Sequence, residues 1–247
     1  MINFCKYFIF WALLVFLGCN KHYQPQKNEF NHYSLKDNTE DNALKNVLIK
    51  YKYKVDSATN MVIASTTNFV TKDGANCALG NFCCDALYFG AKNFYKNDSI
   101  DIVILNRGGL RINLPKGDIK IGTIFELMPF ENELALVTIT GDKLLEVLPA
   151  LADKPHPFLG MKVEINAKKE VTATINNLPI NKTKNYNIIT SDYLANGGDN
   201  FLFFKNPVQL KSSNLKIRDV FISYCKFLTS TKKQIIPYTD ERLQISK

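Results

Sequence analysis

Two glycine pairs flanked by polar side chains are the parts of this 247-residue chain best suited to holding a small ligand. The first pair lies in the hexapeptide Asn106-Arg107-Gly108-Gly109-Leu110-Arg111, directly after an apolar run at residues 102–105 that predicts a buried strand. Adjacent glycines let the backbone turn sharply and approach a ligand closely. Asn106 and Arg111 would then face one concave site, and their amide and guanidinium groups suit a heterocyclic or anionic ligand.

The second glycine pair lies in the octapeptide Asp192-Tyr193-Leu194-Ala195-Asn196-Gly197-Gly198-Asp199. It also follows a strand-like run, at residues 186–190, and it also has polar side chains on both sides. We expect the two turns to converge on one pocket. Each pair by itself is equally consistent with an ordinary turn.

The first 18 residues have the pattern of a bacterial lipoprotein signal peptide. They contain one lysine, an apolar run at residues 8–17, and Gly18 immediately before Cys19. The run is shorter than the roughly 20 apolar residues that span a membrane, which favours a cleaved signal. We therefore expect lipidation of Cys19 and a place in the cell envelope, anchored to a bacterial membrane on its periplasmic or surface side. An uncleaved anchor and plain secretion are the alternatives.

The charge and the cysteine content indicate which ligands the chain is not expected to bind. Loss of residues 1–18 removes one of the 31 basic residues and none of the 23 acidic ones, so the mature side chains carry +7. The lysines are scattered without a run of five or six like charges, so no nucleic-acid partner is expected. The spacing of Cys77, Cys83 and Cys84 fits no zinc pattern, and with Cys225 these thiols are expected to be small buried side chains that bind no metal.

The folded domain is predicted to span residues 41–247, after a polar tether at residues 19–40. Helices interleave with short strands and no βαβ unit repeats, which indicates an α+β or layered α/β fold. Apolar periodicity predicts helices at residues 41–53, 81–92, 121–128, 142–151 and 215–228, and strands at residues 61–66, 102–105, 133–140, 161–165, 171–175, 186–190 and 242–245.

Six motifs, in one order and with regular spacing, carry a family resemblance. They are Leu79-Gly80-Asn81 with Asp85-Ala86, Asn106-x-Gly108-Gly109-Leu110-Arg111, Gly117-Asp118-Ile119, Pro129-Phe130-Glu131-Asn132, Thr140-Gly141, and the octapeptide that ends at Asp199. With them, residues 59–245 resemble the C-terminal, substrate-binding domain of the 5′-nucleotidase and UDP-sugar hydrolase family. The resemblance implies a four-layer α/β/β/α domain that binds the substrate nucleotide, joined in the usual enzyme to an N-terminal metallophosphatase domain.

The resemblance also assigns site residues. Phe130 and Tyr193 would sandwich the base, and each stacking contact contributes about 1–3 kcal/mol. Asp199 would accept hydrogen bonds from the ribose hydroxyls, and Asn106 and Arg111 would lie near the base and the phosphate side. The hydroxyl of Tyr193 is expected to reach only water. The full substrate-binding set is Asn106, Gly108, Gly109, Arg111, Phe130, Asn132, Tyr193, Gly197, Gly198 and Asp199. From composition alone, core packing of the two rings is the alternative.

One departure from the family concerns the phosphate. Family members often carry an arginine a few residues before Leu79, where this chain has Lys72-Asp73. A carboxylate there would repel phosphate unless Lys72 compensates, so a nucleoside is an alternative ligand.

A second departure concerns catalysis. A two-metal phosphoesterase holds its ions with several His, Asp and Asn ligands, but this chain has only His22, His32 and His156. The Gly-Asn-His-Glu stretch of the family's catalytic half is also missing. We therefore predict no catalytic residue, no metal and no cofactor in this chain, and we expect His156 to be a loop residue.

Two functions fit this pattern. The chain is either the nucleotide-binding half of a split 5′-nucleotidase, active on phosphoric monoesters only with a separately encoded metallophosphatase that carries divalent metals, or a non-catalytic lipoprotein that binds nucleosides or nucleotides. A scaffold whose pocket has decayed is the third alternative.

Overall fold

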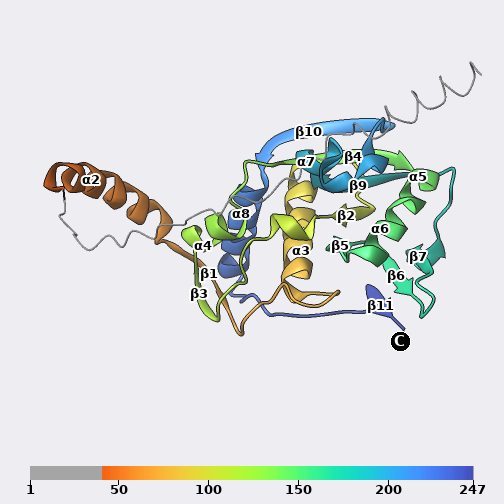
Figure 1. Cartoon of the computed structure of the whole chain (residues 1–247), viewed down its shortest axis with the longest axis horizontal. Helices are drawn as coiled ribbons and strands as arrows, with labels where there is room; N and C mark the ends of the chain where they lie inside the picture. The colour runs from red at the N-terminus through yellow and green to blue at the C-terminus, as the bar shows by residue number, and fades with distance from the viewer. Residues whose placement is uncertain (1–40, 247) are drawn as a thin grey trace, which may run out of the picture. The chain divides into compact units, whose positions relative to one another are not determined.

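The computed structural model describes residues 41–246 (Figure 1). The predicted signal peptide, the lipidation site at Cys19 and the tether therefore lie outside the described residues. Among the helices that are described, none is long and apolar enough to cross a bilayer. The chain divides into two units between Lys45 and Asn46, and all three sheets and the candidate site belong to the second unit.

The described elements alternate between helices and strands. The helices are α2 (Asn42–Thr59), α3 (Ala78–Phe94), α4 (Ile121–Leu127), α5 (Gly141–Leu145), α6 (Val147–Asp153), α7 (Asp192–Ala195) and α8 (Ile217–Ser230), with 3₁₀ turns η1 (Arg107–Gly109), η2 (Gly198–Asn200) and η3 (Leu202–Phe204). The strands are β1 (Val62–Thr66), β2 (Ile102–Ile104), β3 (Gly117–Lys120), β4 (Glu133–Thr140), β5 (Phe158–Leu159), β6 (Lys162–Ile165), β7 (Val171–Ile175), β8 (Leu178–Pro179), β9 (Asn185–Ser191), β10 (Gln209–Lys216) and β11 (Leu243–Ile245).

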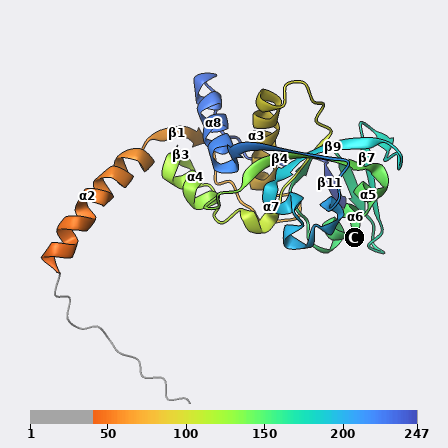
Figure 2. The same cartoon turned by 90° about the horizontal axis from the view of Figure 1, so that it is seen from above.

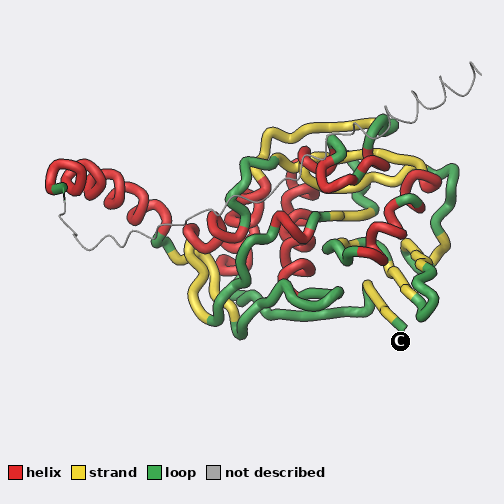
Figure 3. The backbone as a smooth tube through the Cα atoms, in the orientation of Figure 1, coloured by secondary structure: helices red, strands yellow, loops and turns green. Residues whose placement is uncertain are grey.

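A five-stranded sheet in the order β10-β4-β9-β2-β5 forms the centre of the second unit (strands are yellow in Figure 3). Strand β9 pairs in parallel with β2 and antiparallel with β4, so both of its edges are hydrogen-bonded. Successive side chains of a strand point to opposite faces, and the six interior residues of β4 are all buried. The sheet is therefore covered on both faces.

Two hydrophobic cores cover those faces. Helices α3 and α8 lie side by side in both views (Figure 1, Figure 2) and pack with Leu134 and Leu136 of β4 in the first core. Ala135 and Val137, on the opposite face of β4, belong to the second core, which also contains side chains of α5, α6 and the smaller sheet β11-β6-β7-β8. The layered α/β fold predicted from the sequence is confirmed.

Several elements differ from the sequence prediction. The helix predicted at residues 142–151 is two helices, α5 and α6, because Pro149 has no N–H to continue one helix and instead lies in the first turn of α6. Helix α2 continues six residues beyond residue 53, and α3 begins at Ala78 rather than Asn81. Strand β10 is not predicted, since its Ser-Ser-Asn stretch has low β propensity and Asn214 has a positive φ of 55°.

Candidate nucleotide-binding site

Sheet topology brings three loops together at one edge of the five-stranded sheet. Strands β2 and β9 are parallel neighbours, so the glycine turns that follow them leave the sheet at the same end. Strand β4 runs antiparallel to β9, with Leu134 opposite Ser191, so the segment that precedes β4 reaches this end too. The two glycine turns and the loop that carries Phe130 therefore converge, as open α/β sheets favour at the carboxyl ends of their strands.

These loops enclose a cavity of about 320 Å³. Eight of the ten predicted substrate-binding residues line it, namely Asn106, Gly108, Gly109, Arg111, Phe130, Asn132, Tyr193 and Asp199. We call this the aromatic pocket. Gly197 and Gly198 are not among its lining residues, and they shape the turn behind it. The volume lies at the small end of the range for ligand sites, which is about 300–1,000 Å³.

The two aromatic rings of this pocket are half exposed, which is the opposite of core packing. Phe130 is 41% exposed and Tyr193 is 43% exposed. A Cβ atom on Gly198 would lie 2.5 Å from Cζ of Tyr193, so the glycine backbone covers one face of the tyrosine ring. The guanidinium of Arg111 lies 5.9 Å from the ring centroid of Phe130.

Hydrogen bonds hold Asp199 between Asn106 and Tyr193. Nδ2 of Asn106 donates to Oδ2 of Asp199 at 2.7 Å, and the hydroxyl of Tyr193 donates to Oδ1 at 2.8 Å. The same hydroxyl accepts from the backbone N–H of Asp199 at 3.2 Å. The expectation that the Tyr193 hydroxyl reaches only water is therefore wrong, because the tight turn with φ of 50° at Asp199 returns the chain to the ring.

This network sets the charge of the carboxylate. Burial raises the pKa of Asp199, but the hydrogen bonds from Asn106 and Tyr193 outweigh burial and hold that pKa below its ordinary value of 3.8. The hydrogen bond to Asp199 in turn raises the pKa of the Tyr193 hydroxyl. Asp199 is therefore ionised, oriented and ready to accept further hydrogen bonds at neutral pH.

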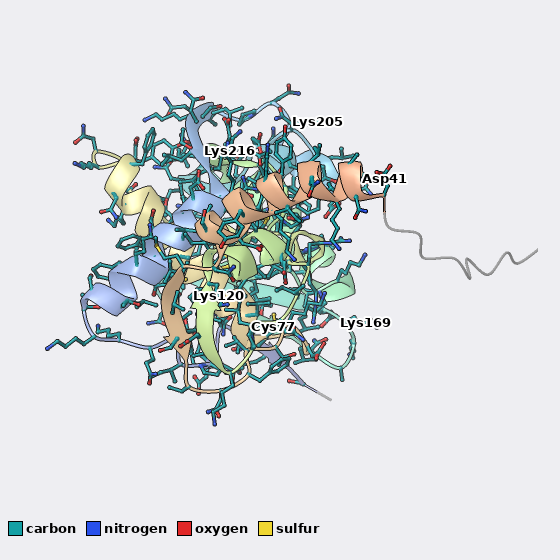
Figure 4. The ribbon with its side chains drawn as sticks, turned by 90° about the vertical axis from the view of Figure 1, so that its left-hand side faces the viewer. Asp41, Cys77, Lys120, Lys169, Lys205 and Lys216 are labelled. Carbon is teal, nitrogen blue, oxygen red and sulfur yellow. The ribbon has the colours of Figure 1, made fainter. Side chains whose placement is uncertain are left out.

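The loop that carries Phe130 is held by residues that the sequence did not single out. Arg218 of α8 forms an ion pair with Glu131 at 2.6 Å, and Lys216, labelled in Figure 4, donates to the carbonyl of Glu131 at 3.0 Å. The backbone N–H of Ile217 donates to the carbonyl of Asn132 at 2.9 Å. Asp192, the first residue of the octapeptide motif, makes a further contact. Its Oδ1 accepts hydrogen bonds from the N–H groups of Glu133 and Tyr193 and so joins the two segments that carry the aromatic rings.

The side chains of Lys72 and Asp73, at the position where family members often carry an arginine, point to different partners. Nζ of Lys72 donates to the carbonyl of Leu110 at 3.3 Å, next to the arginine that lines the aromatic pocket. Asp73 is exposed and accepts a hydrogen bond from the hydroxyl of Thr71 at 2.7 Å. Asp73 does not line the aromatic pocket.

Other predicted features are also placed. The thiols of Cys77, Cys83, Cys84 and Cys225 are buried and unpaired. Within residues 41–246, no three His, Cys, Asp or Glu side chains gather so that they could hold a metal ion. His156 lies in the loop before β5, as expected, and it is buried against Phe201.

Comparisons with known proteins agree with this geometry. Residues 55–206 match the family described as 5′-nucleotidase, C-terminal domain. The chain is 27% identical over 207 residues to a trifunctional nucleotide phosphoesterase of Bacillus subtilis, covering 73% of this chain and 14% of that protein. It is 26% identical over 174 residues to a 5′-nucleotidase of Vibrio parahaemolyticus, covering 66% of this chain and 30% of that protein.

A solved structure shares the fold. The 5′-nucleotidase precursor of Thermus thermophilus superposes with a TM-score of 0.70 and 21% identity, over 84% of this chain and 44% of that one. This chain thus spans less than half of each of these three proteins. The family match covers more than half of the chain, and this chain therefore belongs to the 5′-nucleotidase C-terminal domain family.

Proposed function

We propose that this chain binds a nucleotide or nucleoside in the aromatic pocket and supplies that pocket to a separately encoded metallophosphatase. The two chains together would then hydrolyse the phosphate monoesters of nucleotides. The observation that carries the proposal is the pair of half-exposed rings, Phe130 and Tyr193, in one cavity with the oriented carboxylate of Asp199.

The base, the ribose and the phosphate of a nucleotide each have a complementary group in the pocket. A base stacks on Phe130 and on the face of Tyr193 that Gly198 leaves free, since every base offers a π-face to an aromatic ring. Ribose hydroxyls donate to Asp199, whose oxygens have lone pairs beyond those used by Asn106 and Tyr193. Arg111 provides a charge-assisted contact to a phosphate.

The reaction itself would depend on the partner. In this proposal the metallophosphatase holds the divalent metals and activates the attacking water, while this chain orients the nucleotide. The signal pattern that ends at Cys19 supports an anchor by lipid in the bacterial envelope.

The decisive test is reconstitution. We expect the purified full-length chain in detergent to leave AMP intact with or without divalent metal, and we expect hydrolysis when a matching metallophosphatase is added. The phosphatase assayed alone, and with the Phe130→Ala chain, provides the controls. The split-enzyme proposal would be ruled out if this chain alone hydrolysed AMP with added metal. The rate would have to rise with the concentration of the chain and be the same in independently purified samples.

Lys72-Asp73 at the family's arginine position favours a second candidate function, a lipoprotein that binds nucleosides without any catalytic partner. The two candidates differ in a measurable way. A non-catalytic binder holds adenosine at least as tightly as AMP and raises the activity of no metallophosphatase, including one encoded by a neighbouring gene.

A further inference from the structure

A second cavity adjoins the aromatic pocket. Its volume is about 540 Å³, and it shares Gly108 and Asp199 with the aromatic pocket. Its other lining residues are Lys72, Arg107, Lys154, His156 and Asn200. We call it the cationic pocket. None of the five belongs to the substrate-binding set predicted from the sequence.

The charges of this pocket are unbalanced. Lys72, Arg107 and Lys154 contribute three positive charges, and among the side chains that the structure describes Asp199 is the only acidic one that lines the pocket. None of the three cations forms an ion pair with a described carboxylate. The oxygens of Asp199 already accept hydrogen bonds from Asn106 and Tyr193. Lys72 and Arg107 donate to backbone carbonyls, but no described carboxylate neutralises the positive charge of the three side chains.

Arg107 is half-buried and fixed in place. One Nη2–H group donates to the backbone carbonyl of Lys72, which leaves other N–H groups of the guanidinium for a ligand. Its backbone N–H donates to Nδ1 of His156 at 3.3 Å. The arginine that follows Asn106 is thus held by two segments of the pocket wall, instead of extending into solvent.

His156 supplies a fourth donor. Because Nδ1 accepts the N–H of Arg107, the neutral imidazole carries its proton on Nε2. No described residue accepts a hydrogen bond from Nε2, and the ring is only 7% exposed. Burial lowers the pKa of His156, Asp199 raises it, and Lys154 and Arg107 lower it further, so three charged groups of the pocket act on this ring.

We propose that the cationic pocket binds a phosphate anion through Arg107, Lys154 and the Nε2–H group of His156. A phosphate has several acceptor oxygens, which match the guanidinium fork, the ammonium and the imidazole N–H. Asp199 repels such an anion, so it lies at the end of the pocket away from the aromatic rings. Arg111, which lines the aromatic pocket alone, takes no part.

Two sources carry this chemistry: free inorganic phosphate, and a phosphate on the same nucleotide whose base occupies the aromatic pocket. Asp199 lines both pockets and is the proposed acceptor for the ribose hydroxyls. A phosphate on one of these two ribose oxygens, 2′ or 3′, would therefore extend into the cationic pocket toward Arg107 and Lys154, while the other hydroxyl donates to Asp199. The second source rests on the proposed function, and the first does not.

The test uses His156 as a reporter. The full-length chain in detergent is titrated by NMR with inorganic phosphate, adenosine, adenosine 5′-phosphate and adenosine 3′-phosphate. The His156→Gln spectrum separates the signal of His156 from those of His22 and His32. We expect phosphate to raise the pKa of His156 by about one pH unit, since a nearby anion favours the imidazolium.

Variants separate this site from the rest of the surface. Lys154→Gln, which changes an exposed residue, and Arg107→Gln should each weaken the phosphate response about tenfold or more. Lys226→Gln, an exposed lysine on α8, is the matched control and should leave it unchanged. Phe130→Ala should weaken nucleoside binding by about fivefold to 150-fold but preserve the response to inorganic phosphate, so failure of the proposed function is distinguished from failure of this inference.

The outcomes decide both the site and its source. A response to inorganic phosphate that neither nucleotide exceeds assigns free phosphate, and a stronger response to one nucleotide than to adenosine or inorganic phosphate assigns the phosphate position of that nucleotide. The inference is overturned when no phosphate compound raises the pKa of His156 at concentrations up to tens of millimolar. It is also overturned when Lys154→Gln and Arg107→Gln respond as the wild type does.

Discussion

The two rings of the aromatic pocket are held in different ways. Tyr193 is held by its own turn, since Gly198 covers one face of the ring and Asp199 bonds to the hydroxyl six residues along the chain. Phe130 is held from a distance, because Arg218 and Lys216, more than 80 residues away, fix the neighbouring Glu131. One half of the sandwich is thus built locally, and the other half depends on the tertiary fold.

The largest effects should come from removing either ring. Phe130→Ala removes one stacking face and should weaken adenosine binding by about 1–3 kcal/mol, or about fivefold to 150-fold. Tyr193→Ala should cost more, because it also releases the carboxylate of Asp199. Calorimetric titration of adenosine measures both, with circular dichroism to verify folding. If both variants bind adenosine with wild-type affinity, the two rings do not stack on the base and have only a structural role.

Gly198→Ala tests the local half without removing the ring. The added Cβ would lie 2.5 Å from Tyr193, so the ring must move toward the cavity. Such overpacking typically costs about 1–3 kcal/mol, and we expect adenosine affinity to fall with it. The melting temperature and the adenosine Kd measure the two effects. Unchanged values of both would mean that Gly198 does not determine where the ring lies.

Arg111→Ala separates phosphate recognition from base recognition. AMP binding should weaken more than adenosine binding, by about 1 kcal/mol, because the guanidinium favours the anion and is exposed to solvent. Salt should reduce this difference, since exposed charges are screened. Titrations of both ligands at two ionic strengths measure it. Equal losses for AMP and adenosine would place the phosphate away from Arg111.

Arg218→Gln tests the distant half. It removes the ion pair with Glu131 and frees the loop that carries Phe130, and we expect adenosine affinity to fall by about twofold to fivefold. Lys226→Gln, on the same helix, is the matched control. If adenosine binds the Arg218→Gln chain as it binds the wild type, backbone contacts such as that between Ile217 and Asn132 suffice to hold the loop.

Tyr193→Phe should have an effect of similar size at neutral pH, because it keeps the ring and loses only the hydrogen bond to Asp199. A net hydrogen bond contributes about 0.5–1.5 kcal/mol. The variant should also change the pH dependence. Because the pKa of Asp199 is depressed, its carboxylate stays ionised below the ordinary value of 3.8 and is protonated only as pH falls through the lower folded-state pKa.

Without the hydroxyl, that pKa should rise, so adenosine binding should fade at a higher pH than in the wild type. Kd measured between pH 3 and pH 7 gives the two midpoints. Coinciding midpoints would contradict the role of the hydroxyl.

The sequence predicted the fold well where local pattern decides it. Strands β4 and β7 have the predicted bounds, because β-branched and apolar residues fill them. Strand β10 could not be predicted, since its place comes from pairing with β4 rather than from propensity. The break between α5 and α6 was readable at Pro149 and was missed.

The same distinction holds for the pocket. Six of the eight predicted residues that line the aromatic pocket lie in the two glycine motifs, which are visible in the local sequence, and the family resemblance added Phe130 and Asn132. The hydroxyl contact between Tyr193 and Asp199 and the ion pair between Arg218 and Glu131 are not visible there, because they depend on a left-handed residue and on the docking of α8. The cationic pocket was equally hidden, since Arg107, Lys154 and His156 come from separate segments.

The buried cysteine thiols can be used to measure unfolding of the domain. Alkylating reagents attack the thiolate, and burial raises the pKa of the Cys225 thiol to about 12 and that of Cys83 well above its ordinary value. The three thiols on helices, those of Cys83 and Cys84 on α3 and Cys225 on α8, can then be labelled only while these packed helices are open. The rate of labelling by iodoacetamide would therefore time excursions out of the native state. The labelling rate could therefore rank the stability of every variant described above, without denaturant and at the pH of the binding experiments.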